Sequence, residues 1–222
     1  MQSVILPGRA GPLEALLDTP ALEPGREPVA SLLLCHPHPP SGGTMNTHAV
    51  FRAMRAMRHL GCEVLRFNFR GVGKSAGAWD EGRGELDDGR VALQWLRSRS
   101  PDRPLIAGGF SFGSWVGMTV GVEAGADALL GLGVPYASYD LARVARSELP
   151  KALVLADHDE FTSVAAMREA VERMREPRRL WIVDGATHLF TERLDAYEET
   201  VREAGRWLLE EIGSTGSPPP AR

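Results

Sequence analysis

Cysteine is scarce in this sequence, and both cysteines, Cys35 and Cys62, lie inside or beside predicted strands. So few cysteines exclude a small domain held together by a disulfide framework. Neither cysteine stands at a turn that would expose a thiolate, so we expect two buried, reduced thiols rather than catalytic groups. Cysteine usage therefore favours a cytoplasmic location.

The sequence also lacks an excess of positive charge and long hydrophobic runs. Its 25 Lys and Arg are outnumbered by 29 Asp and Glu, which argues against the basic surfaces typical of nucleic-acid or anionic-membrane binding. No stretch approaches the ~20 apolar residues needed to span a bilayer, and residues 1–12 lack the pattern of a signal peptide. We expect a cytoplasmic protein without nucleic-acid or membrane partners, either a monomer or a homodimer.

Short apolar runs alternate with helical patterns along most of the chain. Their continuous apolar character indicates strands that are buried on both faces. The runs are residues 31–35, 63–69, 105–110, 128–134, 152–156 and 180–183. Before them, residues 3–6 and 13–18 flank Pro-Gly and Gly-Pro pairs, which predicts an antiparallel hairpin. The hairpin and these runs together predict a sheet of about seven to eight strands.

Helical patterns fill the intervals between these strands. They cover residues 48–60, a segment that begins at Asp87 or Asp88 and ends before Pro101, and residues 114–122, 163–174 and 194–212. This alternation implies right-handed crossovers and a mostly parallel sheet flanked by helices. We expect a single α/β domain over residues 1–212. Residues 213–222 are mainly Gly, Ser and Pro, so we expect a disordered tail there.

A G-x-S-x-G pattern places Ser111 directly after the predicted strand 105–110. The pattern is typical of a sharp strand-to-helix turn that exposes a serine hydroxyl as a nucleophile. Glycines two residues before and after the serine, Gly109 and Gly113, leave room for the neighbouring strand and helix. A second match surrounds Ser75, but it lies in glycine-rich chain with no helix start after it. We therefore interpret Ser75 as a loop residue.

A serine nucleophile needs an imidazole base and a carboxylate that orients the base. Along chains with this turn, the usual order is serine, acid, histidine. After Ser111, one predicted strand ends at Asp157, Asp159 and Glu160, and the next is followed by His188. Both turns leave the carboxyl ends of strands, where open α/β sheets hold their sites. His188 is the predicted base, and any of the three acids can orient it.

Together these motifs resemble the α/β-hydrolase superfamily, and most closely its small, lidless, dienelactone-hydrolase-like bacterial members. The resemblance covers about residues 32–209 and rests on residues 36–45, 68–75, 109–113, 157–161 and 185–188. Relatives usually reach the acid through Gly-x-x-Asp, which falls on Asp159 here, with Ala156 in place of the glycine. The resemblance implies catalytic Ser111, Asp159 and His188. Dienelactone hydrolases use a cysteine where this chain has Ser111.

The resemblance also implies two backbone donors for an oxyanion. Relatives commonly read His-Gly-x-Pro after the third strand, and the equivalent run 36–39 assigns one donor to the N–H of His38. The second is the N–H of Phe112, which follows the nucleophile. We expect no cofactor and no metal, because His36, His38 and His48 have no carboxylate or cysteine nearby at ligand spacing.

Only residues 135–150 separate the two strands between which relatives insert a cap, which leaves room for one short helix. The resemblance thus implies an open, shallow site and hydrolysis of small acyl esters through an acyl-enzyme on Ser111. A thioesterase, a small-amide or peptide hydrolase, and a non-catalytic binding protein on the same fold are the alternatives. The aromatic residues expected to line the site are Phe112, Trp115, Tyr136, Tyr139 and Phe161.

Overall fold

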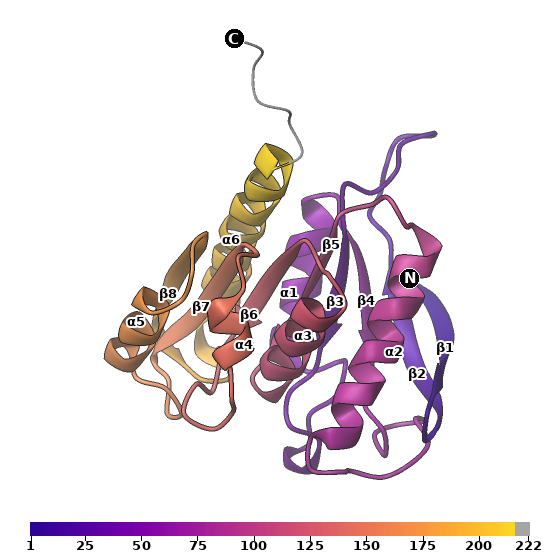
Figure 1. Cartoon of the computed structure of the whole chain (residues 1–222), viewed down its shortest axis with the longest axis horizontal. Helices are drawn as coiled ribbons and strands as arrows, with labels where there is room; N and C mark the ends of the chain where they lie inside the picture. Colours follow the sequence, from indigo (N-terminus) through magenta and orange to yellow (C-terminus); the bar gives the residue numbers. More distant parts are fainter. Residues whose placement is uncertain (216–222) are drawn as a thin grey trace.

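The computed structural model describes residues 1–215 and has one eight-stranded sheet at its centre (Figure 1). The strands are β1 (Gln2–Gly8), β2 (Gly11–Asp18), β3 (Ser31–Cys35), β4 (Glu63–Phe67), β5 (Leu105–Phe110), β6 (Ala128–Leu132), β7 (Lys151–His158) and β8 (Arg178–Thr187). Their order is β1-β2-β4-β3-β5-β6-β7-β8; β2 is antiparallel to both of its neighbours, and the other pairings are parallel. The predicted hairpin and mostly parallel sheet are confirmed.

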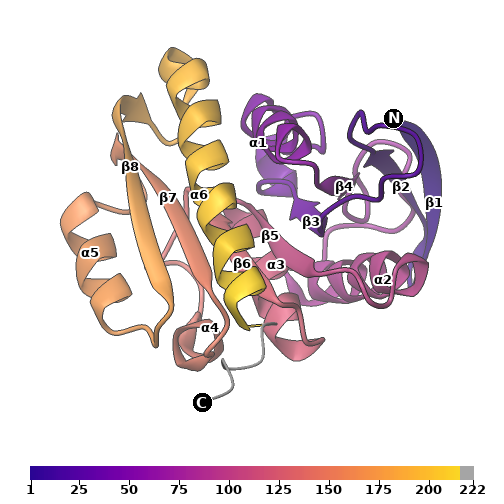
Figure 2. The ribbon, with the colours of Figure 1, turned by 90° about the horizontal axis from the view of Figure 1, so that it is seen from above.

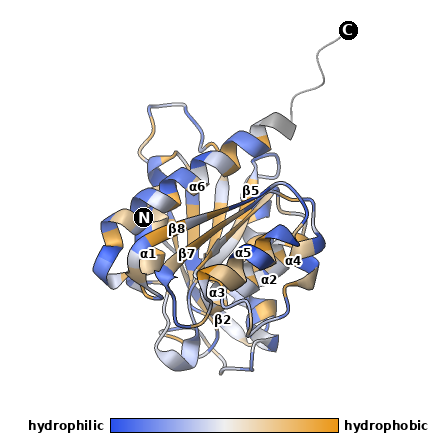
Figure 3. Ribbon diagram, turned by 90° about the vertical axis from the view of Figure 1, so that its left-hand side faces the viewer, coloured by the Kyte–Doolittle hydropathy of each residue, from blue (hydrophilic) through white to orange (hydrophobic). Residues whose placement is uncertain are grey.

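Helices cover both faces of this sheet (Figure 2). One face packs against α1 (His48–His59) and α6 (Leu194–Thr215), and the other against α2 (Arg83–Arg99), α3 (Phe112–Glu123), α4 (Ala142–Arg146) and α5 (Val164–Glu172). Each face buries its own apolar cluster, and the strands are largely hydrophobic while the outer sides of the helices carry polar residues (Figure 3). Continuous apolar strands are what burial on both faces requires.

The connection between β6 and β7 carries a single short helix, α4 (Ala142–Arg146). A cap domain has no room in this connection, which confirms the expectation of one short helix and no cap. In the part of the chain that the structure describes, no helix is both long and apolar enough to cross a bilayer.

Strand β4 ends two residues earlier than predicted, at Phe67. The N–H of Phe69 donates to the imidazole Nε2 of His36, and the N–H of Arg70 donates to the carboxylate of Asp88. Side chains therefore take the backbone donors that a longer strand would have offered to its neighbours.

Helix α2 begins at Arg83, earlier than the predicted start at Asp87 or Asp88. The carboxylate of Glu85 accepts hydrogen bonds from the N–H groups of Asp80 and Gly82, which caps the first turn. Asp88 is buried inside the helix and pairs with Arg70 at 2.8 Å. The predicted cap is thus a tertiary ion pair, a role that local sequence does not reveal.

Helix α6 continues past the predicted end at Ile212, because Gly213 keeps a helical backbone. Three residues of the expected tail therefore belong to the helix. The rest of that tail, residues 216–222, lies outside the described residues.

Candidate active site

Ser111 lies at the turn between β5 and α3 in a strained backbone conformation, with φ 55° and ψ −125°. Such positive φ values are rare outside glycine and cost about 1–3 kcal/mol. The turn is held by the N–H of Ser111, which donates to the carbonyl of Leu132 on the neighbouring strand at 2.8 Å. The hydroxyl of Ser114 also donates to the carbonyl of Ser111 at 2.6 Å. The serine side chain consequently leaves the sheet at its carboxyl edge.

The two glycines that flank Ser111 are required by space. A Cβ at Gly109 would lie 2.3 Å from the carbonyl oxygen of Gly113, and a Cβ at Gly113 would lie 2.4 Å from the carbonyl oxygens of Cys35 and His36. All of these obstacles are backbone atoms, which cannot rotate away. The expectation that side chains here would collide with neighbouring chain is confirmed.

His188 connects Ser111 to Asp159. Its Nε2 lies 2.8 Å from the Ser111 hydroxyl oxygen, and its Nδ1 lies 2.7 Å from the Asp159 carboxylate. The side chains of His188 and Asp159 are only 6% and 1% exposed. In this arrangement the Nδ1–H donates to Asp159, which leaves Nε2 free to accept the serine proton.

Strand pairing brings the histidine and the acid together. His158 at the end of β7 pairs with Thr187 at the end of β8. The next residues along the two strands are Asp159 and His188, so their side chains meet although they are 29 residues apart in sequence. The irregularity in register between Ala156 and His158 sets which residue of β7 reaches that position.

The three candidate acids have different partners in and around the histidine loop. Asp159 contacts the imidazole and also accepts from the N–H groups of Phe161 and Thr162. Asp157 accepts instead from the N–H groups of Gly185 and Ala186, and these bonds hold the pKa of its carboxyl below the ordinary value. Glu160 accepts from the backbone N–H of His188 at 3.0 Å. Two of the acids therefore support the backbone of the histidine loop, and one contacts its ring.

The N–H groups predicted for an oxyanion belong to His38 and Phe112, both of which line the same pocket as Ser111. Among the described residues, neither N–H donates a hydrogen bond to another protein group. Phe112 is the first residue of α3, where a helix leaves its N–H groups without internal partners. Both donors are therefore available to a ligand.

The loop that carries His38 is anchored by His36. Its Nδ1–H donates to the carbonyl of Pro37 at 2.7 Å, and its Nε2 accepts from the N–H of Phe69 at 3.0 Å. Burial lowers the pKa of His36 to about 4, which keeps the ring neutral and able to accept. His36 thus ties the end of β3 to the end of β4, and sequence motifs alone did not indicate this role.

A pocket of 690 Å³ opens above Ser111 and His188. Of the aromatic residues expected to line it, Phe112, Tyr139 and Phe161 do so. Trp115 and Tyr136 do not line the pocket. Trp115 lies behind Tyr139 and stacks on its ring, with ring centroids 4.8 Å apart. Glu160 and Leu189 also line the pocket. Glu160 was expected only as a candidate acid for the imidazole, and the only sequence signal for Leu189 is its position directly after His188.

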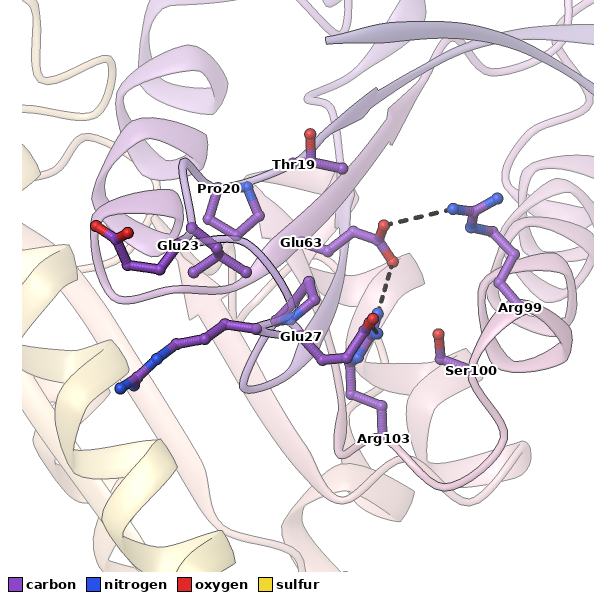
Figure 4. Close-up of a pocket in the computed structure, with 11 residues that line it drawn as sticks. Thr19, Pro20, Glu23, Glu27, Glu63, Arg99, Ser100 and Arg103 are labelled. Carbon is purple, nitrogen blue, oxygen red and sulfur yellow. Dashed lines mark hydrogen bonds and ion pairs between the residues drawn. The ribbon is translucent and has the colours of Figure 1, made fainter.

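A second hollow lies at the opposite, amino-terminal edge of the sheet (Figure 4). Its buried carboxylate, Glu63 at the start of β4, is bound by Arg103 at 3.1 Å and lies 3.7 Å from Arg99. Arg103 also pairs with Glu27 at 2.6 Å. These charges neutralise one another, and no histidine lines the hollow in the part of the chain that the structure describes. It therefore offers no base for acyl transfer.

The fold and the G-x-S-x-G turn at Ser111 together define a class, that of α/β hydrolases without a cap. A sequence model of the alpha/beta hydrolase fold matches residues 31–124. Among curated proteins, the uncharacterised protein RP471 of Rickettsia prowazekii is 31% identical over 181 residues, which span 77% of this chain and 76% of that protein.

Solved structures also resemble most of the chain. An alpha-beta serine hydrolase homologue from Coxiella burnetii superposes with a TM-score of 0.84 at 31% identity, covering 91% of this chain and 96% of that one. A serine hydrolase without lid from Xanthomonas campestris gives a TM-score of 0.83 at 30% identity, covering 98% and 96%. The chain belongs to the α/β hydrolase family.

Proposed function

We propose that this protein is a serine hydrolase that cleaves small carboxylic esters. The observation that carries the proposal is the continuous chain of contacts from the Ser111 hydroxyl through His188 to Asp159, with distances of 2.8 and 2.7 Å. Its position at the floor of an open pocket supports access of a small acyl substrate.

The first chemical step forms the acyl-enzyme. Ser111 Oγ attacks the ester carbonyl carbon while His188 Nε2 takes the hydroxyl proton, and Asp159 stabilises the imidazolium. The carbonyl oxygen becomes an oxyanion that accepts hydrogen bonds from the N–H groups of His38 and Phe112. When the tetrahedral intermediate collapses, the bond to the alcohol oxygen breaks and His188 returns the proton to the departing alcohol.

Water then completes the cycle. His188 removes a proton from a water molecule, whose oxygen attacks the acyl carbon attached to Ser111. The second tetrahedral intermediate releases the carboxylic acid, and the proton returns from His188 to the serine oxygen. A thioester or a small amide would follow the same steps with sulfur or nitrogen as the leaving atom.

The proposed setting is the cytoplasm, with a small molecule as partner. Cys35 and Cys62 are buried and unpaired, and burial raises the pKa of both thiols. Both therefore stay as inert thiols, which leaves Ser111 as the proposed nucleophile.

A fluorophosphonate probe tests the nucleophile. Wild-type protein is incubated with the probe, digested and analysed by mass spectrometry, with nitrophenyl acetate and butyrate hydrolysis measured in parallel. We expect an adduct on Ser111, and loss of both labelling and hydrolysis in Ser111→Ala and His188→Ala. Matched acyl thioesters and anilides then rank the three bond types.

Ser75→Ala is the matched control, since Ser75 occupies the second G-x-S-x-G match. Its hydroxyl donates to the carbonyl of Asn68 at 2.6 Å and accepts from the N–H of Glu14 at 2.9 Å, both structural contacts. We expect this variant to keep the Ser111 adduct. Folded wild-type protein that takes no label and cleaves no ester would overturn the proposal and favour the binding-protein alternative.

A further inference from the structure

The part of the pocket next to His188 combines one carboxylate with two exposed apolar side chains. The Glu160 carboxylate accepts from the backbone N–H of His188 at 3.0 Å. The ring of Phe161 lies 4.6 Å from the imidazole between centroids and is 60% exposed. Leu189, the residue after the histidine, is 52% exposed. All three line the pocket.

This part of the pocket receives the leaving group if the proposed function holds. His188 Nε2 must return its proton to the departing alcohol oxygen, so the alcohol lies beside the imidazole. The carbonyl oxygen points the other way, to the N–H groups of His38 and Phe112. Glu160, Phe161 and Leu189 are therefore the side chains that the alcohol meets.

The charge in this region has one sign. Within residues 1–215, the side chains that line the pocket include no lysine and no arginine, and Glu160 contributes the carboxylate among them. Among the described residues, no cation on the wall offsets its field, and because Glu160 is solvent-exposed this field is partly screened by water and salt. A negative group on the alcohol is repelled here, whereas a positive group is attracted and also meets the ring of Phe161.

We propose that Glu160 sets the charge specificity of the leaving group. The site takes esters whose alcohol part is apolar and either uncharged or positively charged, and it discriminates against alcohols that carry a carboxylate. Phe161 and Leu189 contact the apolar body of the alcohol, and Glu160 selects its charge. This inference rests on the proposed ester hydrolysis and adds a substrate class to it.

Glu160→Gln separates charge from position. The amide oxygen of glutamine can still accept from the N–H of His188, so the histidine loop keeps its hydrogen bond while the negative charge is removed. Glu192→Gln is the matched control, because Glu192 is also exposed, also contacts the histidine loop through the Thr187 hydroxyl, and does not line the pocket.

Three acetate esters test the proposal: phenyl acetate and its para-trimethylammonio and para-carboxylate derivatives. The measured quantity is the ratio of kcat/KM for the cationic ester to that for the anionic ester. Comparing this ratio between variants cancels the different intrinsic reactivities of the three phenols. We expect it to fall about three- to tenfold in Glu160→Gln and to stay unchanged in Glu192→Gln. In the wild type, added salt should lower the ratio through screening.

The outcomes separate the inference from the function on which it rests. If folded wild-type protein does not hydrolyse phenyl acetate, the proposed function fails and the inference fails with it. If phenyl acetate is hydrolysed but the ratio is the same in Glu160→Gln and wild type, only the charge inference is overturned. An equal loss of all three esters in Glu160→Gln would also overturn it, since Glu160 would then only position the histidine.

Discussion

At the scale of single residues, Asp157 and Asp159 show how position decides what a carboxylate does. They are two residues apart at the end of β7, yet Asp159 contacts the His188 ring and Asp157 contacts the backbone of Gly185 and Ala186. A carboxylate on the ring stabilises the imidazolium of the transition state, whereas one on the backbone only holds the loop.

Asparagine at the two positions should therefore have different effects. For Asp159→Asn we expect kcat to fall by about 10³–10⁴-fold with little change in KM, because the amide neither holds the productive tautomer nor balances the imidazolium charge. For Asp157→Asn we expect a loss of less than about tenfold. Steady-state kinetics on nitrophenyl butyrate measure both. Similar losses in the two variants would mean that Asp159 has no special role.

Gly113 is the second residue whose effect can be foreseen from geometry. A Cβ there would lie 2.4 Å from two backbone carbonyl oxygens, so Gly113→Ala should lower the free energy of unfolding by about 1–3 kcal/mol or more. Gly213→Ala is the control, since among the described residues, the helix's own backbone aside, no atom lies within 4 Å of a Cβ at that helical position. This change should be neutral or stabilise by up to about 1 kcal/mol. Urea unfolding compares the variants, and equal stability of both with wild type would contradict the steric argument.

At the scale of elements, the site depends on how the ends of neighbouring strands are tied together. The end of β3 is joined to the end of β4 through the buried ring of His36, and the end of β7 is joined to the end of β8 by register. The two ties differ in chemistry, because an imidazole can be protonated and strand pairing cannot.

The His36 tie should weaken in acid. Its pKa is lowered from the ordinary 6.5 to about 4 by burial, so the unfolded chain binds a proton between these values and the folded protein does not. The stability from neutral His36 is complete above pH 6.5 and is lost as pH falls toward 4. The loss amounts to about 3 kcal/mol.

His36→Gln isolates this contribution. At pH 7 we expect the variant to be less stable than wild type by about 1–3 kcal/mol, because it breaks the buried contacts. The difference in unfolding free energy should then shrink as pH falls from 6.5 to 4, since the variant has no imidazole to protonate at this position. Urea titrations across this range measure it. A constant difference would show that His36 is not the acid-sensitive group.

At the scale of the whole molecule, the absence of a cap decides what the pocket can hold. The β6–β7 connection contains only the five-residue α4, so the carboxyl edge of the sheet stays open at Ser111. An acyl chain that extends beyond the pocket wall stays in water and gains no burial energy.

Acyl length should therefore matter only over a short range. With a series of nitrophenyl esters from acetate to palmitate, we expect kcat/KM to be highest for short acyl groups and to stop rising once the chain exceeds the pocket. The series is measured below the solubility limit of each ester. A steady rise up to long-chain esters would mean that an apolar surface outside the pocket binds the chain.

Local sequence determined much of this molecule. Interactions within a few residues determine the apolar runs of the strands, the periodicity of the helices and the G-x-S-x-G turn. Local sequence patterns were therefore enough to predict the sheet, its flanking helices and the position of Ser111. Two errors at element ends have a tertiary cause: Asp88 pairs with Arg70 instead of capping α2, and Phe69 donates to His36 instead of extending β4.

Which of the three acids contacts His188 is decided by tertiary structure and not by local sequence. The sequence showed that an acid at the end of β7 would face His188, and the resemblance to known hydrolases favoured Asp159. The contact itself is set by the register in which His158 pairs with Thr187, and by the irregularity just before it. Sequence patterns fix which residues lie in a strand, but register between strands far apart in the chain is decided by packing of the whole sheet. Only the tertiary structure could therefore place Asp159 on the imidazole and Glu160 in the wall of the pocket.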